Sequence, residues 1–200
     1  SPQGGPSRSL GESMFHDFDA DRRPLVLIWE VTRACGLACR HCRANAKPER
    51  HPDELTTAEG KRLLDDAARF GDGQLVVLSG GDPLARDDLL ELVSYGDDRG
   101  HRMTITPSGT ASLTPARVEA LADAGIQRIA LSVDGATRES HDRFRGEESF
   151  EDTMTAARAA REAGLPLQIN TTVGADTVDE LPAIRDRVRE LGAVLWSVFF

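Results

Sequence analysis

The sequence lacks the features of a membrane-spanning, secreted or nucleic-acid-binding protein. No run of about 18 apolar residues occurs, so no membrane-spanning segment is predicted. The N-terminus lacks the apolar core of a signal peptide, and we therefore expect a cytoplasmic location. Basic residues are in deficit, because 24 Lys and Arg face 33 Asp and Glu and leave a net charge of −9. This deficit argues against nucleic acid as the main partner, since phosphate binding needs a basic surface.

Cysteine is also scarce, and all three cysteines lie within the short stretch ACGLACRHC, residues 34–42. The spacing is C-x₃-C-x₂-C, formed by Cys35, Cys39 and Cys42. A disulfide would leave one thiol over, and buried core cysteines do not usually cluster beside basic residues. In a reducing compartment, closely spaced cysteines are more often ligands or redox groups. We therefore interpret the stretch as a metal site.

Two kinds of metal site fit three thiolates. Structural zinc takes four ligands, so it would need a histidine such as His41 or His51 as the fourth. An iron–sulfur cluster of four irons, held by three cysteines, leaves one iron open to an exogenous molecule. The neighbouring Arg33, Arg40 and Arg43 favour the thiolate form in either case. The cysteines alone leave both sites open.

The chain divides into a lead-in and one domain. Residues 1–23 are rich in Gly, Ser, Pro, Asp and Arg, and we expect them to be flexible. Residues 24–200 have the composition and pattern of a globular α/β domain. The chain ends inside the apolar run VLWSVFF, which predicts a strand without a following helix. We expect the domain to be truncated at its C-terminus.

Six apolar segments alternate with helical patterns from residue 25 onward. The segments rich in β-branched residues are 25–30, 74–79, 102–106, 128–133, 167–173 and 194–200. Helix-start signals occur at Thr56 with Glu59, at Pro83, at Thr114 with Pro115, at Ser149 with Asp152, and at Thr177 with Glu180. This alternation predicts a parallel sheet with helices outside it. The pattern is compatible with an open doubly wound sheet and with a full or partial barrel.

Polar and glycine-rich motifs follow the predicted strands. They are TRACGLACRHC, SGGDP, TPSGT, SVDG and NTT, in chain order. Because ligands bind at the carboxyl ends of parallel strands, we expect these motifs to form one composite site. Gly80 and Gly81 would let the backbone approach a ligand closely, and Asp82 would hold an ammonium group.

The C-x₃-C-x₂-C motif after the first strand, with His41 before its third cysteine and SGGDP after the second strand, resembles the radical S-adenosylmethionine (SAM) superfamily. The resemblance covers nearly all of residues 24–200 and implies a (βα)₆ partial TIM-type barrel that lacks its last helix. It implies an enzyme of oxidoreductase or lyase type with a [4Fe-4S] cluster on Cys35, Cys39 and Cys42. In such enzymes the cluster reductively cleaves SAM to a 5′-deoxyadenosyl radical, which abstracts hydrogen from a substrate.

The resemblance also implies which residues contact SAM. Gly80, Gly81 and Asp82 correspond to the motif that grips the amino group of SAM. Polar side chains at later strand ends correspond to further contacts, namely Ser108, Ser132 and Asp134. An arginine of HDRFRG, which we expect to form a loop after the fourth strand, would pair with the SAM carboxylate, with Arg143 preferred and Arg145 as the alternate. Asn170, with Thr172 on the same side of its strand, would reach the barrel interior to bind cofactor or substrate, or would only form hydrogen bonds there.

Within the superfamily, the motifs are most similar to the group that carries a SPASM-type C-terminal extension. That similarity implies a peptide or small-molecule substrate, such as a tetrapyrrole side chain in heme d1 or alternative heme synthesis. It also implies an external one-electron reductant such as flavodoxin or ferredoxin, and neither a nucleic-acid nor a membrane partner. We expect this chain to be the core domain only. The alternative function is a zinc-stabilised, non-catalytic α/β binding module.

Overall fold

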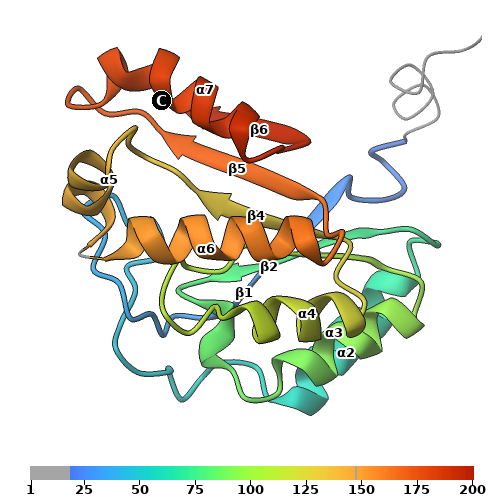
Figure 1. The fold of residues 1–200 in the computed structure, drawn as a ribbon. Coiled ribbons are helices and arrows are strands. Elements are labelled where there is room, and N and C mark those ends of the chain that lie inside the picture. Colours follow the sequence, from blue (N-terminus) through green and yellow to red (C-terminus); the bar gives the residue numbers. More distant parts are fainter. Residues whose placement is uncertain (1–18, 147) are drawn as a thin grey trace, which may run out of the picture.

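The computed structural model describes residues 19–146 and 148–200, so most of the predicted flexible lead-in lies outside the described residues. The described chain forms one six-stranded sheet with helices around it (Figure 1). The strands are β1 Val26–Thr32, β2 Leu75–Gly80, β3 Arg102–Ile105, β4 Arg128–Ser132, β5 Leu167–Thr172 and β6 Leu195–Phe199. Each coincides with one of the six predicted segments.

The strand order settles the choice between the two predicted α/β architectures. The sheet runs β1-β2-β3-β4-β5-β6, and every neighbouring pair is parallel. A doubly wound sheet reverses its order at a switch point, whereas a barrel adds each strand on the same side. Among the described residues β6 does not pair with β1. The fold is therefore a partial parallel barrel, and this prediction is confirmed.

The two faces of the sheet differ because side chains alternate along each strand. On the outer face Val76, Ile129 and Ile169 are fully buried beneath the helices. On the concave face the edge strands carry apolar side chains that remain exposed, such as Ile28 at 63% and Phe199 at 53%. The core therefore lies between sheet and helices, while the inside of the partial barrel is accessible.

Within the described residues, six helices and two short 3₁₀ turns connect the strands. They are α2 Thr57–Ala68, η1 Pro83–Ala85, α3 Leu89–Asp98, α4 Pro115–Asp123, α5 Arg138–Arg145, α6 Ser149–Glu162, η2 Val178–Glu180 and α7 Leu181–Glu190. The capping box of Thr56 and Glu59 is present, and the Thr114 side chain accepts a hydrogen bond from the Arg117 amide. In the described part of the chain, no helix has the length and apolarity needed to cross a membrane.

Two of the predicted capping boxes are wrong. Ser149 is the first residue of α6 rather than its cap, and its hydroxyl donates to Asp142 and to the Gly146 carbonyl. The Thr177 side chain caps no helix. Glu180 instead accepts hydrogen bonds from the Ala136 amide and from the Ser140 hydroxyl. The Ser149 hydroxyl is thus taken by residues that shortly precede α6, whereas the Glu180 carboxylate is taken by residues far along the chain.

The segment between Pro83 and the α3 helix, and the segment HDRFRG, also differ from the prediction. Pro83 begins only a 3₁₀ turn, and α3 starts later at Leu89. HDRFRG was expected to be a loop, but residues 138–145 form helix α5, which a capping box of Thr137 and Ser140 begins. The helical pattern of α5 is hard to recognise in the sequence, because its buried residues, Ser140 and His141, are polar.

A buried arginine ties β1 to the segments that follow it. The Arg86 guanidinium, with 1% of its side chain exposed, donates to the carbonyls of Val31 and Leu55, each at 2.9 Å. It also forms two hydrogen bonds with the Asp88 carboxylate, at 2.6 and 2.8 Å. These bonds hold the pKa of Asp88 at about 2. Arg86 thus fixes the end of β1, from which the cysteine loop departs.

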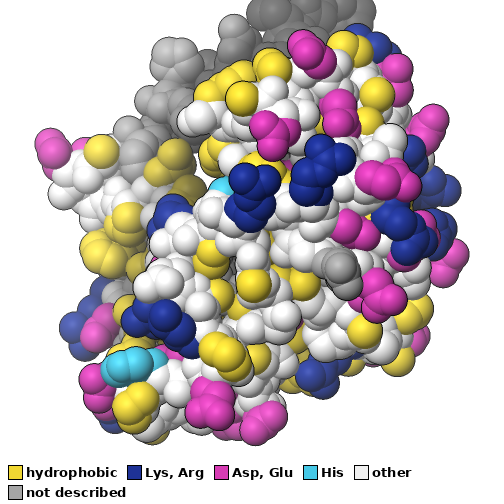
Figure 2. Space-filling view, turned by 90° about the vertical axis from the view of Figure 1, so that its left-hand side faces the viewer, with side chains coloured by type: hydrophobic (Ala, Val, Ile, Leu, Met, Phe, Trp, Pro, Cys, Tyr) yellow, Lys and Arg dark blue, Asp and Glu magenta, His cyan; other side chains and the backbone are white. Residues whose placement is uncertain are grey.

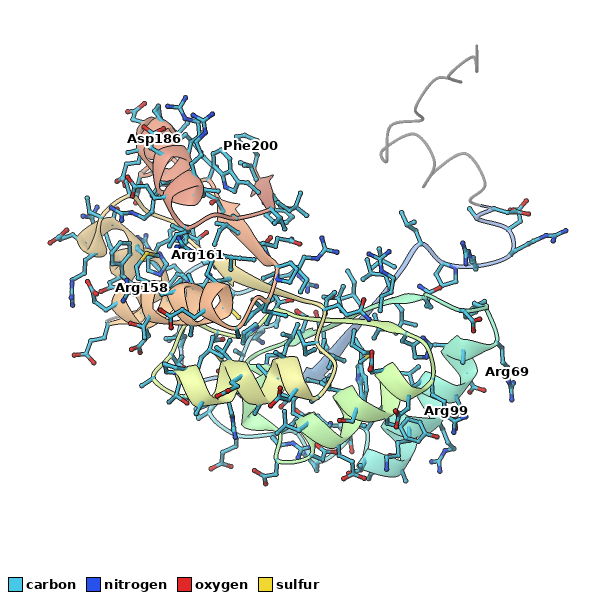
Figure 3. All side chains as sticks on the ribbon, turned by 45° about the vertical axis from the view of Figure 1, so that its right-hand side comes forward. Arg69, Arg99, Arg158, Arg161, Asp186 and Phe200 are labelled. Atoms are coloured by element: carbon cyan, nitrogen blue, oxygen red, sulfur yellow. The ribbon has the colours of Figure 1, made fainter. Side chains whose placement is uncertain are left out.

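We expect Arg86→Ala to lower the free energy of unfolding by about 3–5 kcal/mol, because it removes a buried guanidinium and leaves the partly buried Asp88 carboxylate and two carbonyls without that donor. Urea denaturation followed by circular dichroism measures the change. Arg69→Ala is the matched control, because the Arg69 side chain extends into solvent from the end of α2 (Figure 3). A loss for Arg86→Ala no larger than that for Arg69→Ala would contradict this role.

Candidate metal centre and cofactor site

The loop after β1 is closed at its base and carries all three cysteines. The amide of Cys35 donates to the Lys47 carbonyl, and the amide of Lys47 donates to the Arg33 carbonyl, both at 2.8 Å. Residues 33–47, which we call the cysteine loop, therefore begin and end at the same place. Asn45, with a φ of 46°, makes the turn back toward the base.

The three thiols lie on one small cavity of about 180 Å³. None of them forms a disulfide, and each is partly buried. The cavity is also lined by residues from three other segments, namely Gly80, Gly81, Ser108 and Arg145. It opens at the carboxyl ends of the strands, the side of the molecule that Figure 2 shows, where basic and acidic side chains lie interspersed. Three of the five predicted motifs, TRACGLACRHC, SGGDP and TPSGT, thus meet at this cavity.

Polar hydrogens surround the sulfur atoms, as an iron–sulfur site requires. The amide of Leu37 donates to Cys35 Sγ at 3.4 Å, and the amide of Ala46 donates to Cys42 Sγ at 3.3 Å. Burial raises the pKa of the Cys39 thiol, and the Arg145 guanidinium opposes that rise. The backbone donors and the guanidinium stabilise negative charge on the sulfurs. The donor set therefore fits a cluster bound by three thiolates.

The same geometry does not fit a single zinc ion. Within the described residues, no three His, Cys, Asp or Glu side chains are grouped closely enough to hold one metal ion. His41 faces Asp134, with Nε2 3.8 Å from the carboxylate, and His51 Nδ1 accepts a hydrogen bond from the Asp53 amide. Neither histidine belongs to a described group of three such side chains that could hold one ion. A multi-iron cluster takes its thiolates on different irons and does not need them to converge on one point.

The turn at the end of β2 packs directly on the start of the cysteine loop. The amides of Gly81 and Asp82 donate to the carbonyls of Thr32 and Ala34, at 2.7 and 2.6 Å. A Cβ on Gly80, whose φ is +132°, would collide with the Thr32 carbonyl, and one on Gly81 would collide with the Ala34 carbonyl. The two glycines are thus required by backbone contact with the loop, besides lining the cavity.

Asp82 is buried behind the cavity and does not line it. Its Oδ1 accepts hydrogen bonds from the amides of Leu84 and Ser108, at 3.1 and 3.3 Å. Burial raises the pKa of Asp82, and these two amides oppose the rise. The Ser108 hydroxyl donates to the Gly81 carbonyl and lies 3.2 Å from Cys35 Sγ. In this structure Asp82 positions Ser108, and Ser108 is the residue that reaches the cysteines.

Asp134 joins the cavity to the second half of the sheet. It is 1% exposed, and its two oxygens accept hydrogen bonds from Arg145 Nη1 at 2.8 Å and from the Thr172 amide at 2.7 Å. Arg145 lines the cavity, whereas Arg143 is exposed on the other side of α5. Arg145, the alternate candidate, is therefore the arginine that lies beside the cysteines, and Asp134 holds it there.

The end of α5 also contacts the cysteine loop. The His41 ring stacks on Phe144 at a centroid distance of 4.2 Å, and the Arg40 amide donates to the Phe144 carbonyl at 3.2 Å. Burial lowers the pKa of His41, while Asp134 opposes that shift. Burial likewise lowers the pKa of His141 to about 4, so its ring is neutral at neutral pH. The neutral ring accepts a hydrogen bond from the Asp134 amide at Nδ1. The stacked rings of His41 and Phe144 therefore support the cysteine loop by packing.

The remaining candidates lie on the concave face. Ser132 and Asn170 are partners in the register of β4 and β5. Asn170 lines a larger cavity of about 720 Å³ inside the partial barrel, and its Oδ1 accepts a hydrogen bond from Gln168 at 2.8 Å. Thr172 participates through its amide, which binds Asp134. Ser132 and Asn170 are therefore placed toward the barrel interior rather than at the cysteines.

Glu54 was not predicted from the sequence, although its hydrogen bonds join the segments before and after the cysteine loop. Glu54 accepts hydrogen bonds from the Thr32 hydroxyl and from the amides of Arg33 and His51, at 2.8–3.0 Å, and from the Arg50 side chain at 2.9 Å. Burial works to raise its pKa, but these hydrogen bonds outweigh it and lower the pKa of Glu54 to about 2. No local pattern marks Glu54, because its partners are about 20 residues away or in an irregular turn.

Comparison with known proteins shows which family the chain resembles. Residues 29–188 match a family profile that is described as "Radical SAM superfamily". The chain is 43% identical over 178 residues to an AdoMet-dependent heme synthase from Methanosarcina barkeri, covering 88% of this chain and 50% of that protein. It is 35% identical to a PqqA peptide cyclase from Ruegeria pomeroyi, covering 85% and 45%. The chain thus spans about half the length of these curated relatives.

Solved structures share the fold at low sequence identity. Streptococcus suis SuiB bound to S-adenosylmethionine has a TM-score of 0.76 at 21% identity, over 88% of this chain and 40% of SuiB. A structure of anSMEcpe with bound AdoMet has a TM-score of 0.72 at 17% identity, over 87% of this chain and 50% of that one. These likenesses support the partial barrel, and the family profile that matches residues 29–188 carries the family assignment.

We expect Gly81→Ala to disrupt the metal centre, because the added Cβ would meet the Ala34 and Arg33 carbonyls at the base of the cysteine loop. Forcing this contact apart should lower the free energy of unfolding by about 1–3 kcal/mol and remove most of the bound iron and sulfide. Chemical analysis after anaerobic reconstitution measures the loading. Gly36→Ala is the control within the loop, since nothing lies within 4 Å of its Cβ. Equal loading of both variants would show that the contact is dispensable.

Proposed function

Because the chain belongs to the radical SAM superfamily, we propose that it is an enzyme that uses a [4Fe-4S] cluster on Cys35, Cys39 and Cys42 for the reductive cleavage of SAM. The observation that carries the proposal is the shared cavity of the three cysteines, with Gly80, Gly81 and Arg145 on its walls. When bound, the cluster and SAM supply one-electron reduction of a sulfonium and hydrogen-atom abstraction from a substrate. The superfamily uses both cofactors, and relatives of known structure were crystallised with SAM.

The residues of this chain would hold and orient the cofactors. The three thiolates ligate the cluster, and the backbone donors at Leu37 and Ala46 stabilise their charge. Arg145, with 11% of its side chain exposed and fixed by Asp134, presents a guanidinium to the SAM carboxylate. Ser108 adds a hydroxyl beside Cys35. Ser132 and Asn170 remain candidates for contacts deeper in the barrel.

We infer that the substrate is a tetrapyrrole of the kind that the relatives' names describe. The supporting observation is the 41–43% identity to three AdoMet-dependent heme synthases, with a further 36% identity to an Fe-coproporphyrin III synthase. The concave cavity of about 720 Å³ is of a size that accepts such a ligand. A peptide is the second candidate, because the chain is 35% identical to PqqA peptide cyclases.

The remaining parts of the proposal concern the setting of the reaction. Residues 24–200 act as the radical SAM core domain, following the lead-in at residues 1–23. An external protein such as flavodoxin or ferredoxin supplies the electron. A cytoplasmic location agrees with three cysteines that are all free thiols.

We expect Cys39→Ala to abolish cluster assembly and SAM cleavage together, since the remaining two thiolates cannot hold the cluster. The measurements are iron and sulfide content, and the 5′-deoxyadenosine formed with dithionite under anaerobic conditions. Ala38→Ser is the control, because it changes an exposed neighbour in the same loop. SAM cleavage by Cys39→Ala at the wild-type rate would refute the ligand assignment.

A second pair of variants separates the two arginines of α5. We expect Arg145→Gln to raise the Kd for SAM by about 10- to 100-fold, the loss of one charge-assisted interaction. Arg143→Gln should leave the Kd unchanged, because Arg143 lies outside the cavity. Equilibrium dialysis with labelled SAM and cluster-loaded protein measures both values. A larger effect of Arg143→Gln would reverse the assignment.

A further inference from the structure

The inside of the partial barrel has apolar walls. Helices α2, α3, α4 and α6 cover the outer face of the sheet, and the concave face stays open (Figure 1). The cavity there, of about 720 Å³, is lined by apolar side chains of β1, β2 and β6, namely Val26, Ile28, Leu75, Val77, Leu195 and Phe199. Such walls favour an apolar ligand.

Arg128 interrupts these walls at the amino end of β4. It lines the large cavity and also a second pocket of about 210 Å³ beneath it, to which Arg102 of β3 contributes. Arg128 is partly buried and Arg102 is exposed. Within residues 19–146 and 148–200, neither side chain forms a hydrogen bond or an ion pair. Two guanidiniums thus lie on neighbouring strands without a counter-charge.

The other charged and amide groups of the large cavity have partners, whereas the hydroxyls of Ser79 and Thr106 form no hydrogen bond within the described residues. Glu30 is the one acidic residue on the described lining, and its carboxylate binds Arg43 at 2.6 Å. Gln168 donates to Asn170, and the Thr104 hydroxyl donates to the Val76 carbonyl. A partly buried charge without a partner is costly, and it is unexpected in a chain with a net charge of −9. An anionic ligand would offset this cost.

The position of Arg128 sets a length for that ligand. Arg128 lies four residues before Ser132 on β4, which is about 13 Å along the strand. Beyond the end of the strand lies the cysteine cavity, and Arg43 lines both cavities and so marks where they meet. A ligand that spans them carries an anionic group at least about 13 Å from the part that faces the cysteines.

We propose that Arg128, assisted by Arg102, binds a carboxylate of the substrate and thereby points the opposite end of the substrate at the cysteine cavity. The substrate class is an apolar macrocycle with several carboxylates at its rim, for which coproporphyrin III is a probe. This assignment rests on the proposed function for its substrate, but its test needs no SAM cleavage. A peptide is less favoured, because the chain is 43% identical to an AdoMet-dependent heme synthase and 35% identical to a PqqA peptide cyclase.

The test is the binding of free-base coproporphyrin III to the cluster-reconstituted chain, followed by fluorescence anisotropy. We expect Arg128→Gln to raise the Kd by about tenfold or more, and Arg128→Lys, which keeps the charge, to raise it by less. The tetramethyl ester of the same porphyrin should bind wild type and Arg128→Gln equally, because it has no carboxylate to lose. Circular dichroism establishes that each variant is folded.

Arg158→Gln is the matched control, because it removes one positive charge from α6 on the outside of the molecule (Figure 3). Its Kd for coproporphyrin III should equal that of wild type. The proposal is overturned if Arg128→Gln binds as wild type does, or if the ester is equally sensitive to the substitution. If the wild-type protein did not cleave SAM, that result would contradict the proposed function. The differences in Kd between the variants would still test the role of Arg128.

Discussion

The site depends on the close contact between two backbone segments at the carboxyl edge of the sheet. The turn of Gly80 to Asp82 donates two short hydrogen bonds to Thr32 and Ala34, at a place where no side chain fits between them. This contact fixes the start of the cysteine loop against β2. Asp82 then holds the backbone of Ser108, whose hydroxyl lies beside Cys35. The glycines therefore act first on the protein's own loop, and the cavity is a consequence of that packing.

A second constraint brings the later strands to the same place. Asp134 at the end of β4 binds Arg145 of α5 and the backbone of β5, and Phe144 stacks on His41 of the cysteine loop. A buried carboxylate is tolerated because its oxygens are satisfied by a guanidinium and an amide. The two halves of the sheet thus meet around the thiols. The arrangement explains why polar residues far apart in the sequence surround one small cavity.

Much of this arrangement could be predicted from the sequence, and the failures have physical causes. The strands were predictable because buried parallel strands are apolar on both faces, and the cysteine spacing has few chemical interpretations. The role of Asp82 was not, because the sequence does not show whether a carboxylate faces a cavity or binds nearby amides. Glu54 was missed, and Glu180 was wrongly assigned to a helix cap, since their partners lie far along the chain. Arg145 could be separated from Arg143 only once α5 was seen to be a helix.

The central claim is that three thiolates of the cysteine loop hold a four-iron cluster with one iron left open for SAM. Mössbauer spectroscopy of the chain reconstituted with ⁵⁷Fe, recorded before and after addition of SAM, tests it most directly. The account predicts that SAM changes the signal of one iron site and leaves the other three as they were. A fully assembled cluster whose spectrum is unchanged at saturating SAM would contradict it.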